Sequence, residues 1–242
     1  MLTFKILSVL LSYPEAELLP ALTEMSTLIK QEKLLTGKTE NAVLSLIDSL
    51  RTQDVFDSQE YYVTLFDRGR FLSLHIFEHV HGESRERGQA MVNLLDMYES
   101  HGFQVNVQEL PDYIPLFLEF LAQIPQAEAQ QLLQDALPVL ALLGARLTER
   151  NSAYAAIFDA LLDLAGAPEL LAESCEQIAL EGEDDTLVNL DAIWEEEMVS
   201  FMGAGATTCQ SQSATTSPIT IMSRDQLLSQ QEQLRSTHSA LN

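Results

Sequence analysis

Basic residues are scarce in this 242-residue chain. It has 13 Lys and Arg against 36 Asp and Glu, and its formal net charge at pH 7 is −23. Nucleic-acid binding needs a basic surface that neutralises phosphates, and attachment to an anionic membrane also depends on clustered cations. The charge balance therefore argues against both. It favours a basic or amphipathic polypeptide as a partner, although solubility alone would explain it equally well.

Cysteines and long apolar runs are also few. The two cysteines, Cys175 and Cys209, form no CxxC pair and no disulfide framework, which is typical of a reducing compartment. The longest uninterrupted apolar run, residues 136–145, is too short to span a bilayer. The apolar N-terminal stretch is followed at once by Pro14 and Glu15, without a signal-peptidase site. We expect a soluble, cytoplasmic protein.

Strand patterns are nearly missing as well. The single alternating segment, residues 103–107, has no second strand with which to pair. Almost every other segment up to Phe201 repeats its apolar residues at helical spacing, and Gly and Pro number only ten and eight. We therefore predict an all-α fold, a single helical bundle, over residues 1–202. Residues 203–242 are small, polar and of low complexity, and we expect a mostly disordered tail there.

Several residues predict where helices begin and end. Asp57 and Glu60 have the spacing of a capping box. Ser84 is suited to cap the helix that follows it, and Gly102 is suited to end that helix. Pro138 is expected to kink or interrupt a long helix.

The most unusual segment is residues 65–91, LFDRGRFLSLHIFEHVHGESRERGQAM. It concentrates basic residues and histidines in an otherwise acidic chain: Arg68, Arg70, Arg85, Arg87, His75, His79 and His81. Such a block could dock a partner, or it could form an exposed network of ion pairs that contributes little stability.

Within this block, residues 75–79 match the H-x-x-E-H pattern of inverted zincins. His75 and His79 would be zinc ligands and Glu78 the general base, so a zinc-dependent hydrolase is the alternative hypothesis. The sequence contains no G-x-S-x-G, P-loop or G-x-G-x-x-G motif, which argues against the corresponding enzyme classes.

A second candidate site begins at Glu109. Asp112 and Glu119 are seven residues apart and would share a helix face, with Leu116 between them and Phe120 alongside. An apolar side chain framed by two carboxylates suits a groove for a peptide that carries Leu and Arg. The equally weighted alternative is that Asp112 interacts with the positive end of the helix dipole.

Three segments carry a resemblance to a known family: residues 65–91, residues 109–125 (ELPDYIPLFLEFLAQIP) and residues 184–201 (DDTLVNLDAIWEEEMVSF). They resemble the NarJ/NarW family, which are assembly chaperones of respiratory nitrate reductase. The resemblance covers about residues 1–201. That family is similar to the wider TorD/DmsD group, whose motif reads E-x-P-D-H. Glu109, Pro111 and Asp112 match this motif, while Tyr113 replaces its histidine.

The resemblance implies a TorD-like, non-enzymatic chaperone without a cofactor of its own. Its client would be the catalytic (alpha) subunit of nitrate reductase, including the N-terminal leader-like segment of that subunit, alone or in the alpha–beta complex. The chaperone would keep this subunit competent for molybdenum cofactor insertion before membrane attachment. It would not itself bind the membrane stably, and it would be absent from the mature enzyme.

Together the groove and the resemblance assign two sets of residues. The client-peptide set is Glu109, Pro111, Asp112, Tyr113, Leu116, Glu119 and Phe120. The docking-surface set is His79, Glu83, Arg85 and Arg87. A further alternative is that Arg85, Arg87 and the helix N-terminus after Ser84 bind the anionic molybdenum cofactor directly.

Overall fold

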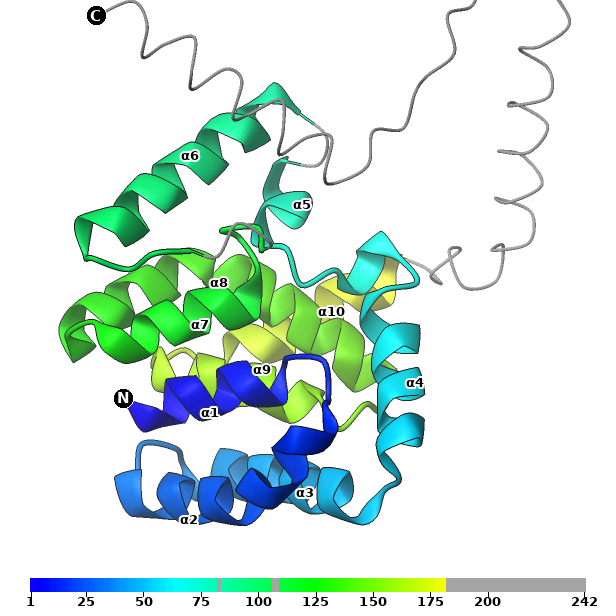
Figure 1. Cartoon of the computed structure of the whole chain (residues 1–242). Coiled ribbons are helices and arrows are strands. Elements are labelled where there is room, and N and C mark those ends of the chain that lie inside the picture. The colour runs from blue at the N-terminus through cyan, green and yellow to red at the C-terminus, as the bar shows by residue number, and fades with distance from the viewer. Residues whose placement is uncertain (82–83, 106–108, 182–242) are drawn as a thin grey trace, which may run out of the picture. The chain divides into compact units, whose positions relative to one another are not determined.

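A computed structural model describes residues 1–81, 84–105 and 109–181, all of which belong to the unit Met1–Ala192 (Figure 1). These residues form ten α-helices and two short 3₁₀-helices. In order they are α1 (Leu2–Leu10), η1 (Ala16–Ala21), α2 (Leu22–Glu32), α3 (Gly37–Thr52), α4 (Val55–Phe66), η2 (Arg70–Leu72), α5 (Ile76–His81), α6 (Arg85–Ser100), α7 (Ile114–Gln123), α8 (Gln126–Glu149), α9 (Ala155–Leu164) and α10 (Leu170–Glu181).

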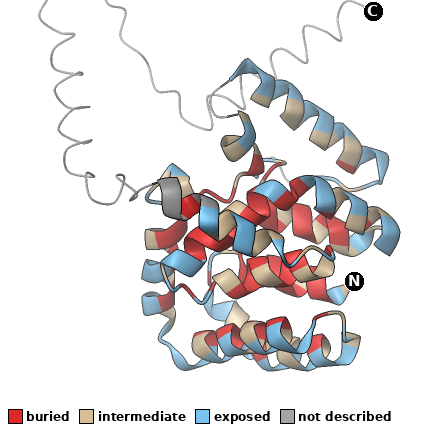
Figure 2. Ribbon diagram, turned by 180° about the vertical axis from the view of Figure 1, so that it is seen from behind, coloured by how far each residue is buried: buried red, intermediate tan, exposed pale blue. Residues whose placement is uncertain are grey.

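The helices of the middle of the bundle are the most deeply buried. α1 packs along α7, and α8 packs against both α9 and α10. α2 contacts α1 and α3, and α3 contacts α9. Figure 2 shows the buried residues concentrated in these central helices, while α6 is largely exposed. The predicted all-α bundle is confirmed, since the described ranges contain no strand and only an isolated antiparallel bridge between His75 and Tyr113.

That bridge joins the His-rich block to the start of α7. The Ile76 amide donates to the Asp112 carbonyl at 3.0 Å, and the Ile114 amide donates to the Leu74 carbonyl at 2.8 Å. Both segments are short and irregular, so these bonds satisfy backbone groups that would otherwise lack partners. The bridge fixes the position of α5 against the N-terminus of α7.

Some predicted helix ends are confirmed and others are wrong. Gly102 ends α6 with a φ of +75°, and its amide donates to the Glu99 carbonyl at 2.9 Å. Ser84 occupies the N-cap position of α6, but its side chain makes no capping hydrogen bond. The N-cap of α4 is Asp54, whose carboxylate accepts from the Phe56 amide at 2.9 Å. The predicted capping box at Asp57 therefore lies inside the first turn.

α8 continues through Pro138, so the helix is not interrupted there. Pro138 is exposed, whereas its neighbours Leu137 and Val139 are buried. Packing on the inner face therefore outweighs the backbone hydrogen bond that proline cannot make.

The predicted tail, residues 203–242, lies outside the described residues. Among the helices that the structure does describe, none is both long enough and apolar enough to cross a membrane.

Candidate peptide-binding site

Asp112 is fully buried, with 0% of its surface exposed. One carboxylate oxygen lies 3.1 Å from Nδ1 of His75, and the other accepts from the Phe77 amide at 3.1 Å. The Phe77 amide belongs to the first turn of α5, where backbone donors need partners. In the free chain this carboxylate holds α5 against α7, as a buried structural partner. The assignment of Asp112 to the client-peptide set stays a prediction.

The other members of the predicted groove face have different surroundings. Phe120 is also 0% exposed, with its ring centroid 4.6 Å from that of Tyr98 and 5.7 Å from that of Phe103. Leu116 is half-buried against the core, and Glu119 pairs with Lys5 of α1. α7 begins at Ile114 and directs Phe120 into the core of the free chain, and its role in client binding stays a prediction.

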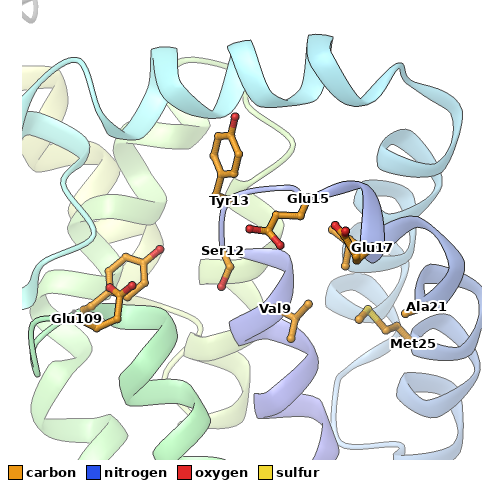
Figure 3. A pocket seen from close by; sticks show the side chains of 10 residues that line it. Val9, Ser12, Tyr13, Glu15, Glu17, Ala21, Met25 and Glu109 are labelled. Atoms are coloured by element: carbon orange, nitrogen blue, oxygen red, sulfur yellow. The ribbon is translucent and has the colours of Figure 1, made fainter. Parts of the chain in front are cut away.

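A hollow of about 510 Å³ lies beside the predicted face, where the end of α1, η1, the start of α2 and the segment before α7 meet (Figure 3). We call it the α1–α2 hollow. Its lining residues are Val9, Ser12, Tyr13, Glu15, Glu17, Leu18, Ala21, Met25, Glu109 and Tyr113. Glu109 and Tyr113 of the predicted client-peptide set therefore do line a hollow, together with residues of the N-terminal segment.

The α1–α2 hollow combines apolar side chains with unpaired acids. Val9, Leu18 and Met25 supply half-buried apolar surface. Glu15, Glu17 and Glu109 are exposed around it, and within the described part of the chain no hydrogen bond or ion pair engages their carboxylates. No lysine or arginine is among the lining residues. The hollow is therefore suited to an amphipathic segment that carries both apolar and basic side chains.

Tyr113 stands at the edge of this hollow as a neutral hydrogen-bonding group. Burial raises the pKa of its phenol, and the nearby Glu109 and Asp67 carboxylates raise it further. Its hydroxyl lies 3.3 Å from that of Tyr62. The phenol stays protonated near neutral pH, so it does not titrate in the range in which a histidine at this position would.

Sequence reasoning missed the N-terminal part of the hollow. Residues 13–17, YPEAE, directly follow an apolar helix, and in the sequence they argue only against a signal peptide. Two acids and a proline next to a buried helix could have indicated an acidic rim. The approach of this segment to Glu109 could not be predicted. The two are more than 90 residues apart, and the spacing of neighbouring residues reports only local structure.

The three residues of the H-x-x-E-H pattern have separate partners. His75 is bonded to Asp112, the Nε2 atom of His79 lies 2.8 Å from the Ser73 carbonyl, and Glu78 pairs with Arg87 at 3.1 Å. α5 has only six residues. In the ranges that the structure describes, no cluster of three or more His, Cys, Asp or Glu could hold a metal ion. The geometry gives no support to the zinc hydrolase alternative.

The predicted docking surface is only partly exposed. His79 is half-buried, and burial lowers the pKa of its imidazole. Arg87 is half-buried in its pair with Glu78, whereas Arg85 is exposed. Glu83 lies outside the described residues. Pro111 is half-buried, and its carbonyl accepts from the Tyr98 hydroxyl at 2.9 Å.

These observations define an all-helical protein with an acidic, apolar hollow and no assembled catalytic group among the described residues. Residues 32–160 match the profile of the family described as "Nitrate reductase delta subunit". The chain is 51% identical over 201 residues to the nitrate reductase molybdenum cofactor assembly chaperone NarJ of Escherichia coli K12, which covers 83% of the chain and 85% of that relative. The chain belongs to the NarJ/NarW family of assembly chaperones, which are not catalytic enzymes.

Two other relatives show the same relationship. The probable nitrate reductase molybdenum cofactor assembly chaperone NarW of Escherichia coli K12 is 43% identical over 208 residues, or 86% of the chain and 87% of the relative. The probable chaperone NarJ of Bacillus subtilis 168 is 32% identical over 161 residues, or 66% and 86%. The family resemblance that the sequence motifs indicated is confirmed.

Proposed function

We propose that this chain is a cytoplasmic chaperone that binds the catalytic subunit of a respiratory nitrate reductase and keeps it competent for molybdenum cofactor insertion. Two observations support the proposal. The chain is similar over most of its length to proteins named as such assembly chaperones. It also carries a hollow whose acidic rim and apolar lining suit one amphipathic segment of a client.

The client segment we propose is the leader-like N-terminus of the catalytic subunit. Its apolar side chains would lie against Val9, Leu18 and Met25, and its basic side chains would pair with the carboxylates around them. A volume of about 510 Å³ is within the range of small binding pockets, so it accommodates a few side chains rather than a whole domain. Attraction between a basic segment and this acidic rim would mainly raise the association rate and make binding sensitive to salt.

Other parts of the chaperone would contact the rest of the client. Leu116 and Glu119 are half-buried on the adjoining face of α7 and could extend the contact along that helix. His79, Arg85 and Arg87 remain our candidates for docking the folded body of the subunit, alone or within the alpha–beta complex. The chaperone domain would comprise residues 1–202. Once the subunit has received its cofactor, the chaperone would dissociate before the enzyme matures at the membrane.

Replacement of the resident chaperone in a nitrate-respiring bacterium tests this proposal. A strain that lacks its own assembly chaperone would receive this chain, and the catalytic subunit would be isolated for molybdenum analysis. We expect the catalytic subunit to copurify with the chain before maturation and to contain molybdenum afterwards. Absence of copurification, with molybdenum at the level of the deletion strain, would contradict the proposal.

A further inference from the structure

A second hollow, of about 370 Å³, adjoins the α1–α2 hollow. We call it the aromatic hollow. Its lining residues include Tyr13, Tyr62, Phe66, Asp67, His75 and Tyr113. Tyr13 and Tyr113 line both hollows, so the two spaces lie on either side of this pair of tyrosines. A segment bound in one hollow is therefore within reach of the other.

The aromatic rings provide both a floor and a rim. Tyr62 and Phe66 are only 3% and 5% exposed, with ring centroids 4.8 Å apart. Tyr13 is 44% exposed, and its ring meets that of Tyr62 nearly at a right angle with centroids 5.7 Å apart. The face of an aromatic ring carries negative electrostatic potential, so a cation inserted among these rings is attracted to them.

Asp67 supplies the one carboxylate that lines this hollow. It is the exposed C-cap residue of α4. It lines the hollow together with Tyr62 and Tyr113, and its charge contributes to raising the pKa of both phenols. Among the described residues, no hydrogen bond or ion pair engages this carboxylate, and no lysine or arginine lines the hollow. The positive partner that this arrangement favours is therefore absent from the described part of the chain.

We infer that the aromatic hollow binds one cationic side chain of the client segment, and that it sets the register of that segment in the α1–α2 hollow. The inference rests on the proposed function. Arginine is the better occupant, because its planar guanidinium stacks on a tyrosine ring and donates to a carboxylate at the same time. Lysine would form the ion pair with Asp67 but would stack less well.

The two hollows would therefore read different properties of the client. The α1–α2 hollow accepts apolar side chains within a diffuse acidic field, which tolerates many amphipathic sequences. The aromatic hollow accepts one cation at one position relative to them. A fixed spacing between the apolar residues and that cation would distinguish the client leader from other basic segments.

A double-mutant cycle tests this pairing. The probe is a peptide that covers the N-terminus of the nitrate reductase catalytic subunit. Each basic residue in turn is replaced by a neutral analogue of similar length, citrulline for arginine and acetyl-lysine for lysine. We expect Asp67→Asn to weaken binding of the unmodified peptide about fivefold and Tyr13→Leu to weaken it by a similar factor. For the peptide neutralised at one particular position, Asp67→Asn should have no further effect.

Asp57→Asn is the matched control, because Asp57 is an exposed acid on the same helix that lines neither hollow. Equal weakening by Asp57→Asn, or equal weakening of every neutralised peptide by Asp67→Asn, would overturn the inference while leaving the proposed function in place. Failure of the unmodified peptide to bind the wild-type chain would contradict the proposed client segment. It would also overturn the inference that the aromatic hollow binds a cation of that segment.

Discussion

At the scale of single residues, Asp112 joins two segments that are distant in sequence. Its carboxylate accepts from the first turn of α5 and contacts His75, and its carbonyl accepts from the Ile76 amide. A fully buried carboxylate without these partners would be strongly unfavourable, and a donor that loses the carboxylate is unfavourable by a smaller amount. Asp112 therefore stabilises the region around the hollows.

Asp112→Ala is expected to lower the free energy of unfolding by about 1–3 kcal/mol, because the partly buried Phe77 amide loses its charged acceptor. Chemical denaturation measures this change, with Asp96→Ala on the exposed face of α6 as the control. A variant with wild-type stability that no longer binds the client peptide would contradict this structural role and support direct binding by Asp112.

His79 gives a prediction for pH dependence. Burial lowers the pKa of its imidazole, and the Arg146 cation lowers it further, although Glu78 and Asp112 act in the opposite direction. The unfolded chain, with a histidine pKa near 6.5, then binds more protons around pH 6 than the folded chain does. The free energy of unfolding should therefore fall as the pH drops below about 6.5. Denaturation at several pH values should show a weaker decrease for His79→Gln.

His101 gives the opposite prediction, because its pKa is raised in the folded chain whereas that of His79 is lowered. A hydrogen bond to the Met97 carbonyl and the Glu128 carboxylate raise its pKa. Its contribution to stability is present at low pH and is lost as the pH rises through the folded-state pKa. His101→Gln should therefore change stability below pH 6.5 and leave it unchanged above the folded-state pKa. A steeper acid dependence in His79→Gln than in the wild type would contradict this account.

At the scale of helices, Gly144 permits close packing in the core. A Cβ atom at this position would lie 2.9 Å from the Cβ of Phe158 on α9 and 3.2 Å from Leu171 on α10. Gly144→Ala should therefore destabilise the protein by about 1–3 kcal/mol, despite the higher helix propensity of alanine. Thermal or chemical unfolding measures the change.

Gly88 on α6 is the matched control. A Cβ atom there would meet no heavy atom within 4 Å. Gly88→Ala should stabilise the chain by about 0.5–1 kcal/mol, because only the propensity term remains. Equal effects of the two substitutions would show that packing at the α8–α9 contact is looser than the structure indicates.

The helices were largely predictable from sequence, but the site was not. Apolar residues at helical spacing reflect local geometry, and Gly102 ends α6 as expected. The predicted groove assumed that Asp112 and Glu119 share one helix, whereas α7 begins only at Ile114. Bonds from Asp112 to residues more than 30 positions away fix that boundary. Local spacing carries no information about such contacts.

At the scale of the whole molecule, negative charge is spread along the chain, but we propose that the acids at the two hollows contribute most to client binding. The chain has a net charge of −23, so it attracts any basic peptide weakly and over a distance that salt shortens to about 10 Å at 0.1 M. The proposed function requires more than this general attraction. It requires that Glu15, Glu17 and Glu109 matter more than equally charged residues elsewhere.

Calorimetric titration with the N-terminal peptide of the nitrate reductase catalytic subunit tests this claim most directly. The test variant carries Glu15→Gln, Glu17→Gln and Glu109→Gln. We expect saturable binding to the wild-type chain, and we expect the triple variant to bind at least about tenfold more weakly with a smaller dependence on salt.

The control variant removes the same number of charges from exposed positions on or just before α10, by Glu169→Gln, Glu173→Gln and Glu176→Gln. The account predicts that this variant binds the peptide nearly as tightly as the wild type. Equal weakening by the two triple variants, or wild-type affinity in both, would contradict it, because binding would then depend on net charge alone or on another surface.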